Sequence, residues 1–441
     1  MSTDDVKTIE PLSGPLSGSC VVPGDKSISH RAILFSAMAE GASRLSGVLD
    51  SSDVRASIDA VRKLGAEVTL EKQPDGSLSG GVVGWGAKGP KQPDGPIYCA
   101  NSGTTARLLM GILAPWDIEV KITGDESLSR RPMRRITAPL MKMGVSFDPA
   151  VAETLPIVER GTRDLRAISY DSPMASAQLK TAVLLAGVYA NGTTTVNEPS
   201  TSRNHTELML PEFGVETTAS ELSASVNGPA ALKSCEVVVP GDPSSAAFLI
   251  CAALLKKGSA IQIENVSLNT ARTGFFRTLE RMGADIEVHR TGSSGKEPFG
   301  VMSACYSGKL RGCEVPGSKI ASLVDEVPVL ALVAAFARGV TVFRDAGELR
   351  AKETDRLTAV RNGLAQLGVD SWIEGDDLFV EGNPDLEIPD GIVFDSLGDH
   401  RLAMTWSLVG LTGEKPVGIK NFSCVDVSYP DFLKDIERLV R

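Results

Sequence analysis

The sequence has few aromatic residues, few histidines and no paired cysteines. Phe, Trp and Tyr make up 5% of the 441 residues, so the cores must be built mainly from Ala, Val, Leu and Ile. The four histidines lie at no metal-ligand spacing from one another or from a cysteine, which argues against a zinc site. The seven cysteines are an odd number and contain no Cys-x-x-Cys pair, which indicates reduced thiols rather than disulfides.

The chain also lacks an excess of positive charge and any long apolar run. A net charge of −10 argues against general nucleic-acid binding, but local arginine clusters can still bind small anions. The longest apolar stretches, Ala246–Leu255 and Val327–Ala337, are shorter than the roughly 18 residues that cross a bilayer. Residues 1–14 lack the basic and apolar parts of a signal peptide. We therefore expect a cytoplasmic, metal-free α/β protein.

What the sequence does contain is internal repetition. Val22-Pro23-Gly24-Asp25 returns as Val239-Pro240-Gly241-Asp242 and nearly again as Val315-Pro316-Gly317-Ser318. Each copy leads into an Ala-rich apolar segment, and such segments recur at intervals of roughly 70–80 residues. The predicted first helices of six repeats are Ser27–Glu40, Gly103–Leu113, Ala175–Tyr189, Ser244–Lys256, Val324–Ala337 and Asp399–Leu411.

The second half of each of the first five repeats contains a glycine followed by a strand-like run. We expect these glycines to end helices in the left-handed conformation; they are Gly65, Gly144, Gly214, Gly283 and Gly368. Three repeats in each half predict two domains, residues 23–240 and residues 1–22 plus 241–441. The chain would cross between them near 22–24 and 239–242, although ordinary strand-to-helix turns are the alternative there.

Polar residues gather where the predicted helices of the first half begin, and a helix start is a ready site for anions. Lys26 stands just before the first helix, where Ser27 can cap it or approach an anion, and Arg31 follows one turn later. In the second repeat, Gly103 allows close approach of a ligand, and four arginines surround Pro132, which suits the first position of a helix. In the third repeat, Ser176 and Gln178 open a helix, and Arg203 follows the next strand.

The fifth and sixth repeats add carboxylates. Asp325 and Glu326 begin an apolar helix, and Lys352 and Arg356 are predicted to share one helical face near Glu353. Asp399 should cap the last of these helices, with His400 and Arg401 in its first turn. Each feature alone also fits a capped or salt-bridged solvated helix.

If the helix starts converge between two domains, the cleft gathers cations suited to several phosphates and carboxylates. Asp325 and Glu353 would then be the acid/base candidates. The expected cations are Lys26, Arg31, Arg107, Arg131, Arg203, Lys352, Arg356 and Arg401.

Several segments resemble the signatures of the 5-enolpyruvylshikimate-3-phosphate synthase family. They are Val-Pro-Gly-Asp-Lys-Ser-Ile-Ser-His-Arg from Val22, Arg-Pro-Met from Arg131, Lys-Glu-Thr-Asp-Arg-Leu from Lys352 and Asp-His-Arg-Leu-Ala-Met from Asp399. The resemblance runs in order from about Leu16 to Arg441. It implies an α/β fold of two similar domains, each of three βαβαββ-type repeats in an inverse α/β barrel-like arrangement.

The resemblance implies a reaction as well. Such enzymes transfer the carboxyvinyl group of phosphoenolpyruvate to the 5-hydroxyl of shikimate 3-phosphate, by addition and elimination through a tetrahedral intermediate. Phosphate is released, and no metal or cofactor is needed. By the same resemblance we expect a monomer that binds neither nucleic acid nor membrane.

Site residues carry over by matching position. Those implied for shikimate 3-phosphate are Lys26, Ser27, Arg31, Ser176, Ala177, Gln178, Arg203, Asp325 and Lys352. Those implied for phosphoenolpyruvate are Lys26, Gly103, Arg131, Gln178, Arg356 and Arg401. Asp325 would take the proton of the attacking hydroxyl, and Glu353, Lys26 and His400 would handle protons at the methylene and the phosphate.

The chain departs from the commoner pattern at several positions. Ala177 stands where many members have a second serine, Val427 where many have lysine, and Glu348 where many have asparagine. Ser102 replaces a common alanine, and together these differences suggest a divergent bacterial branch. Gly103 keeps the glycine whose replacement by alanine is associated in the family with glyphosate tolerance, so we expect glyphosate to inhibit.

Three other functions compete with this interpretation. The related enolpyruvyl transferases that act on a UDP-sugar typically use a cysteine on a mobile loop, whereas Cys99 here belongs to the strand before Gly103. A cyclase of RNA 3′-phosphate ends would need a nucleotide site and a catalytic histidine in a different context. A non-catalytic anion-binding protein would explain the arginines but would not need Asp325 and Glu353.

Overall fold

The computed structural model describes residues 5–440, which group into two compact units. The N-unit comprises Pro23–Pro240 together with Ser293–Glu297. The C-unit comprises the described residues up to Val22, then Gly241–Gly292, and the chain from Pro298 onward. The five residues Ser293–Glu297 form the tip of a hairpin whose two strands otherwise belong to the C-unit, a detail that the predicted domain limits do not contain.

Each sheet is built around one strand with a parallel neighbour on one side and an antiparallel neighbour on the other. In the N-unit, the parallel pairs are β14 with β3, β6 with β7, and β10 with β11. Its sheets have the orders β14-β3-β5-β4, β6-β7-β9-β8 and β10-β11-β13-β12. The strands are β3 (Ala42–Val48), β4 (Glu67–Lys72), β5 (Leu78–Val83), β6 (Ile97–Tyr98), β7 (Glu119–Thr123), β8 (Ser146–Asp148), β9 (Ile157–Arg160), β10 (Ser169–Asp171), β11 (Gly192–Asn197), β12 (Thr217–Ala219), β13 (Ser223–Gly228) and β14 (Glu236–Val238).

The C-unit repeats this plan, with β2 parallel to β15, β18 to β19 and β22 to β23. Its sheets have the orders β16-β17-β15-β2, β18-β19-β21-β20 and β1-β23-β22. The strands are β1 (Val6–Ile9), β2 (Ser17–Val21), β15 (Ala260–Ser267), β16 (Asp285–Ser294), β17 (Glu297–Cys305), β18 (Glu314–Val315), β19 (Gly339–Phe343), β20 (Ser371–Glu374), β21 (Asp377–Gly382), β22 (Val393–Asp395) and β23 (Val417–Lys420). The same local pairing in all six sheets confirms the predicted α/β repeat architecture.

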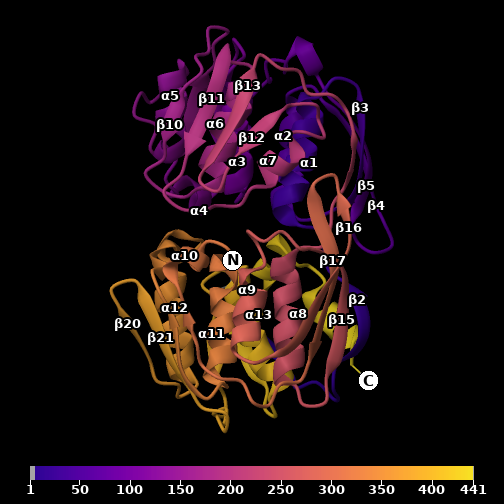
Figure 1. Cartoon of the computed structure of the whole chain (residues 1–441), viewed down its shortest axis with the longest axis vertical. Coiled ribbons are helices and arrows are strands. Elements are labelled where there is room, and N and C mark those ends of the chain that lie inside the picture. Colours follow the sequence, from indigo (N-terminus) through magenta and orange to yellow (C-terminus); the bar gives the residue numbers. More distant parts are fainter. Residues whose placement is uncertain (1–4, 441) are drawn as a thin grey trace. The chain divides into compact units, whose positions relative to one another are not determined.

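The helices divide into apolar ones, buried on every side, and amphipathic ones. In the C-unit, α8, α11 and α13 pack against one another and run side by side in Figure 1. Helices that are apolar all round lie inside a protein, and every residue of α11 is buried. The C-unit helices are α8 (Pro243–Leu255), α9 (Gly274–Arg281), α10 (Gly317–Ile320), α11 (Val327–Ala335), α12 (Arg356–Gln366), α13 (His400–Thr412) and α14 (Phe432–Arg438), with 3-10 turns η2 (Val324–Glu326), η3 (Ala346–Ala351) and η4 (Phe422–Val427).

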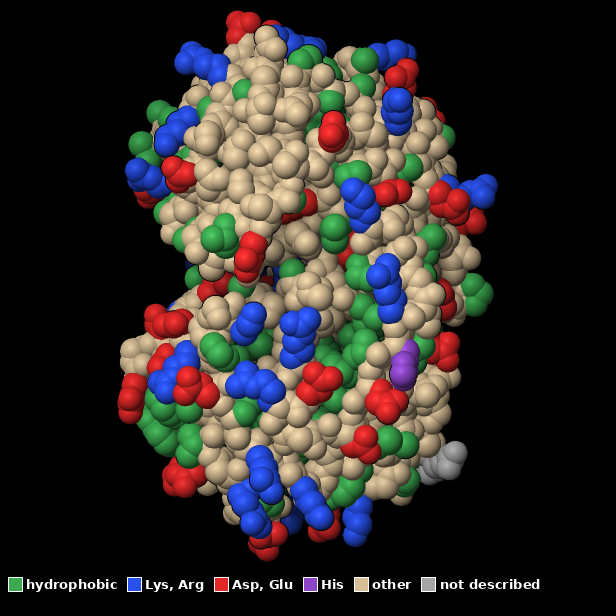
Figure 2. All heavy atoms as spheres, viewed as in Figure 1, with side chains coloured by type: hydrophobic (Ala, Val, Ile, Leu, Met, Phe, Trp, Pro, Cys, Tyr) green, Lys and Arg blue, Asp and Glu red, His purple; other side chains and the backbone are tan. Residues whose placement is uncertain are grey.

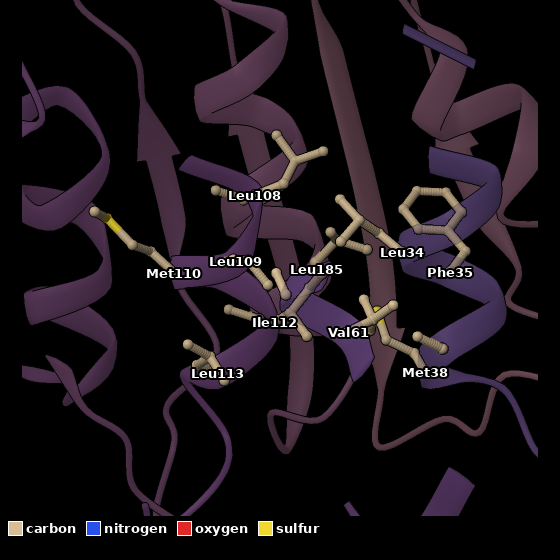
Figure 3. Close-up of a cluster of buried hydrophobic side chains, with 14 of the residues drawn as sticks. Leu34, Phe35, Met38, Val61, Leu108, Leu109, Met110, Ile112, Leu113 and Leu185 are labelled. Atoms are coloured by element: carbon tan, nitrogen blue, oxygen red, sulfur yellow. The ribbon is translucent and has the colours of Figure 1, made fainter. Parts of the chain in front are cut away.

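The N-unit core is likewise centred on apolar helices, with α3 packed against both α1 and α6. Figure 3 shows Leu34 and Phe35 of α1 in the same buried cluster as Ile112 of α3 and Leu185 of α6. The N-unit helices are α1 (Lys26–Met38), α2 (Ser52–Lys63), α3 (Gly103–Leu113), α4 (Glu126–Ser129), α5 (Arg134–Met143), α6 (Ala177–Gly187) and α7 (His205–Met209), with the 3-10 turn η1 (Gly86–Lys88).

The five glycines predicted to end the second helices have the expected conformation. Their φ angles range from 76° at Gly368 to 115° at Gly144, a region that residues with a Cβ rarely adopt. In α5, for example, the backbone N–H of Gly144 bonds back to Met141 as the chain turns toward β8. The sequence therefore correctly predicted where the second helices of these five repeats end.

The surface carries charge of both signs. Figure 2 shows basic and acidic side chains interspersed over the visible face of the molecule. Within residues 5–440, no helix is both long and apolar enough to span a membrane.

Candidate functional site

In the N-unit, the start of α1 is capped by Asp25, whose Oδ1 accepts the backbone N–H of Ile28 at 2.8 Å. Lys26 is the first residue of the helix, and its Nζ lies 3.3 Å from Oδ2 of Asp53 at the start of α2. The prediction that Ser27 could cap this helix is wrong because the helix begins before Ser27, at Lys26, and Asp25 occupies the capping position. Ser27 lies in the first turn.

Arg31 is buried in the N-unit, with 3% of its surface exposed. Its Nε donates to Thr206 Oγ1 and one Nη to Thr181 Oγ1, both at 2.8 Å, while the other Nη donates to the carbonyl of Ser27 at 3.0 Å. Burial lowers the pKa of Arg31 to about 10, partly countered by Glu207 and further lowered by the nearby Arg203. Two predicted phosphate-binding arginines, from α1 and from the segment before α7, therefore lie close together.

The starts of α3 and α6 are joined by side chains. Arg107 donates to Gln178 Oε1 at 2.7 Å, and Gln178 Nε2 donates to Thr104 Oγ1 at 3.0 Å. A Cβ on Gly103 would lie 2.9 Å from an Nη of Arg107 and 3.6 Å from one of Arg131. The structure thus brings Gly103, Arg107 and Arg131 of the second repeat together with Gln178 of the third.

Arg131 lies between α4 and α5 and is held by neutral groups of the second repeat. It donates to Asn101 Oδ1 at 2.6 Å and to Ser127 Oγ at 3.3 Å. The prediction that Pro132 takes the first helical position is wrong. The helix α5 begins two residues later, at Arg134, because Met133 occupies the N-cap position.

Ser176 caps α6, and Ala177 is the first residue of that helix. The Ser176 Oγ accepts the N–H of Leu179 at 3.4 Å. Because this oxygen is used as an acceptor, the hydroxyl hydrogen remains to donate to an anion at the helix start, where the helix dipole also favours negative charge.

In the C-unit, Arg356 is the centre of a carboxylate cluster. It is 1% exposed, and its Nε donates to Asp399 Oδ2 at 2.7 Å and one Nη to Asp325 Oδ1 at 3.0 Å. Its other Nη donates to Glu353. Burial alone would lower the pKa of Arg356, but the carboxylates of Asp399, Glu353 and Asp325 raise it above its usual value.

Asp325 lies among three cations. Besides Arg356, Arg401 approaches it at 3.6 Å and Lys352 at 3.9 Å. Asp399 caps α13 by accepting the backbone N–H of Arg401 at 2.9 Å, as predicted, which places the buried His400 and Arg401 in the first turn. The C-unit therefore brings together Asp325, Lys352, Glu353, Arg356 and Arg401, and His400 precedes Arg401 in α13.

The predicted shared helical face of Lys352 and Arg356 is wrong. The segment before α12 is the 3-10 turn η3, and α12 begins only at Arg356, because Asp355 caps it through the N–H of Thr358 at 3.1 Å. The two cations meet instead through Asp325. Glu348, one of the departures from the family pattern, accepts from Lys352 Nζ at 2.7 Å.

Comparisons with known proteins agree over nearly the whole chain. The family described as EPSP synthase (3-phosphoshikimate 1-carboxyvinyltransferase) matches residues 11–436. The 3-phosphoshikimate 1-carboxyvinyltransferase of Bacillus pumilus is 42% identical over 97% of this chain and 98% of its own length. That of Parvibaculum lavamentivorans is 44% identical over 96% and 94%. This chain belongs to the EPSP synthase family.

Solved structures agree with this membership. EPSP synthase from Acinetobacter baumannii superimposes with a TM-score of 0.87 at 37% identity, covering 99% of this chain and 98% of that one. The enolpyruvyl transferase NikO from Streptomyces tendae gives a TM-score of 0.77 at 20% identity, covering 98% and 97% respectively, and shares the fold.

Around the residues expected of an EPSP synthase, the structure adds partners that the sequence motifs do not reveal. Lys180, Glu198 and Glu207 form a buried ionic cluster in the N-unit, with Lys180 Nζ 2.8 Å from each glutamate. Lys180 lies within an apolar helix and the two glutamates lie between motifs, so only the fold reveals their pairing. In the part of the chain that the structure describes, no cluster of His, Cys, Asp and Glu is suited to a metal ion.

Proposed function

We propose that this chain catalyses the reaction named for its family, the transfer of the carboxyvinyl group of phosphoenolpyruvate to the 5-hydroxyl of shikimate 3-phosphate, with release of phosphate. This is a step in the biosynthesis of aromatic amino acids. Family membership over residues 11–436 supports the activity. The observation that carries the mechanism is the position of Asp325, with Arg356 at 3.0 Å and two further cations within 4 Å.

The proposal assigns the sugar phosphate and phosphoenolpyruvate to residues that the two units hold in place. Shikimate 3-phosphate would bind Lys26, Ser27, Arg31, Ser176, Ala177, Gln178, Arg203, Asp325 and Lys352. Phosphoenolpyruvate would bind Lys26, Gly103, Arg131, Gln178, Arg356 and Arg401. Arginine suits both ligands because its planar fork matches phosphate and carboxylate oxygens.

The reaction needs proton transfer at two places. The 5-hydroxyl oxygen adds to the substituted carbon of the alkene while the methylene carbon gains a proton, and elimination then removes that proton and expels phosphate. Asp325 would accept the hydroxyl proton. Glu353, with Lys26 and His400, would serve the methylene and the phosphate, and the arginines would stabilise the departing phosphate.

We also propose that residues 23–240 and residues 1–22 plus 241–441 act as two domains, crossed near 22–24 and 239–242. Closure around the substrates would exclude water and strengthen the electrostatic interactions of the site. Family precedent further supports a cytoplasmic location and a monomeric state. Light scattering on the purified protein would test the monomeric state.

The deciding experiment mixes the purified protein with shikimate 3-phosphate and phosphoenolpyruvate and measures phosphate release. Mass spectrometry should detect the enolpyruvyl product in equal amount. A UDP-sugar in place of shikimate 3-phosphate is the control and should release no phosphate. Absence of turnover, with both substrates shown to bind, would reject the proposed function.

A further inference from the structure

Glu198 is a buried carboxylate, 7% exposed, that follows β11 in the N-unit. Both of its oxygens are engaged. Oε1 accepts the backbone N–H of Ser176 at 2.8 Å, and Oε2 accepts the hydroxyl of Ser202 at 2.8 Å. Glu198 therefore connects, by two hydrogen bonds, the start of α6 with the residue immediately before Arg203.

Lys180 forms an ion pair with the same carboxylate oxygen of Glu198 that accepts from Ser202. It lies one turn along α6 from Ser176, and its Nζ is 2.8 Å from Glu198 Oε2 and 2.8 Å from Glu207 Oε1. Burial lowers the pKa of Arg31, and Glu207 on α7 counters part of that lowering, so a line of alternating charge runs from Glu198 through Lys180 and Glu207 to α1.

A buried ion cluster of this kind is weak grounds for stability alone, because apolar residues of similar volume often serve as well. Its geometry indicates another role. Glu198 contacts the backbone of one residue assigned to the sugar phosphate, Ser176, and the neighbour of another, Arg203. Both residues lie on the N-terminal side of a helix, where small errors of position weaken binding of an anion.

We propose that Glu198, held by Lys180, is a positioning residue for the phosphate of shikimate 3-phosphate. It orders the Ser176 cap and the Ser202–Arg203 segment without contacting the substrate itself. This inference rests on the proposed function and deepens it, because it assigns to one buried carboxylate the affinity for one of the two substrates.

The test compares steady-state kinetics of the wild-type chain and Glu198→Gln with each substrate varied in turn. The amide has a single acceptor oxygen, so it cannot accept from the Ser176 N–H on one side and from Lys180 and Ser202 on the other. The KM for shikimate 3-phosphate should therefore rise on the order of 10- to 100-fold. The KM for phosphoenolpyruvate and kcat should each stay within about threefold, as expected when binding of one substrate is lost. Calorimetric titration with shikimate 3-phosphate should show the same loss of affinity.

Two further variants keep the result interpretable. Ser202→Ala removes one contact to Glu198 and leaves the ion pair with Lys180, so it should fold and raise the same KM about three- to tenfold. Glu159→Gln is the matched control, because Glu159 is 1% exposed in β9 of the same unit and belongs to no contact of this cluster. Its KM for either substrate should equal that of the wild type.

An unchanged KM for shikimate 3-phosphate in both Glu198→Gln and Ser202→Ala overturns the proposal. So does a fall in kcat with both KM values unchanged, since that pattern reports a smaller folded fraction. If Glu198→Gln does not fold, the KM of Ser202→Ala decides. Failure of the wild-type chain to turn over the two substrates would reject the proposed function instead, so the two failures are separable.

Discussion

In the N-unit the buried arginine of α1 is held by two hydroxyls and a carbonyl, whereas in the C-unit Arg356 is held by three carboxylates. Arg131 of the N-unit follows the first pattern, with Asn101 and Ser127 as its acceptors. Arg401 of the C-unit follows the second, near Asp325 and Glu326.

This difference separates two chemical tasks. A cation bonded to neutral oxygens keeps its charge uncompensated by those partners, which suits the capture of a phosphate. A cation surrounded by carboxylates fixes their positions, which suits the transfer of protons to and from a substrate. We therefore expect substitutions in the N-unit to weaken mainly the binding of anions, and substitutions in the C-unit to slow mainly the proton transfers.

The largest expected effect is on turnover in Asp325→Ala. Removing the proposed base should lower kcat about 10³-fold or more, within the range known for general acid–base groups. Binding of shikimate 3-phosphate, measured by calorimetry, should weaken by less than about tenfold. If the chain is a non-catalytic anion-binding protein, the wild type itself will show no turnover. If the variant keeps its turnover, Asp325 is not the base of the reaction.

The next effect concerns stability and compares one arginine from each unit. Arg356→Gln leaves the fully buried Asp399 without its cation and should lower the free energy of unfolding by about 3–4 kcal/mol. Arg31→Gln leaves hydroxyls and a carbonyl and should cost about 1–2 kcal/mol. Urea unfolding of both variants measures the difference, and equal losses would contradict the distinction between the units.

A smaller effect tests whether the N-unit cations face the ligand. In Gly103→Ala, the new Cβ would lie 2.9 Å from Arg107, so that guanidinium must move. The concentration of glyphosate that halves activity should rise about tenfold, with a smaller rise in the KM for phosphoenolpyruvate. Inhibition equal to that of the wild type would show that Gly103 does not border the inhibitor.

The smallest effect on activity comes from a carboxylate that lacks the cations of the C-unit, although its effect on stability depends strongly on pH. Among the described residues, neither oxygen of Glu159 has a hydrogen-bond partner, and burial raises the pKa of this carboxyl well above its usual value. Below the ordinary pKa of glutamate both states are protonated. Above it the unfolded chain ionises first, so stability falls as pH rises toward the raised pKa.

Glu159→Gln should remove this dependence. Relative to the wild type, the variant should gain stability progressively over the pH range above about 4, by up to about 1.4 kcal/mol for each pH unit until the raised pKa is reached. Thermal unfolding across that range measures the gain, and parallel pH profiles of the two proteins would show that Glu159 ionises freely in the folded state.

Much of the fold could be predicted because each repeat carries local signals. The predicted helix Gly103–Leu113 matches α3 at both ends, since Ser102 caps it and the apolar run fixes its length. The start of α13 was predictable for the same reason, since Asp399 caps it. The spacing of four residues wrongly predicted a shared helical face for Lys352 and Arg356, because Asp355 caps α12 and the helix therefore begins only at Arg356.

Pairings across the chain were beyond reach of the sequence. Arg356 and Asp399 are 43 residues apart, and each alone fits a solvated helix. Lys180 resembles an isolated charge in an apolar helix until the fold places Glu198 and Glu207 beside it. Local patterns specify which residues begin helices, but only the tertiary structure specifies which of them meet.

The hairpin of β16 and β17 has a consequence for the order in which the protein folds during synthesis. Within the described residues, the three sheets of the N-unit are complete once β14 has been made. The buried His205, however, makes a side-chain contact with the carboxylate of Glu297, which lies 92 residues later in the chain. Strands β2 and β1, made first, wait still longer for β15 and β23. The sheets of the N-unit can therefore form before the contact between His205 and Glu297 exists, whereas β2 waits for β15 and β1 waits for β23, near the end of the chain.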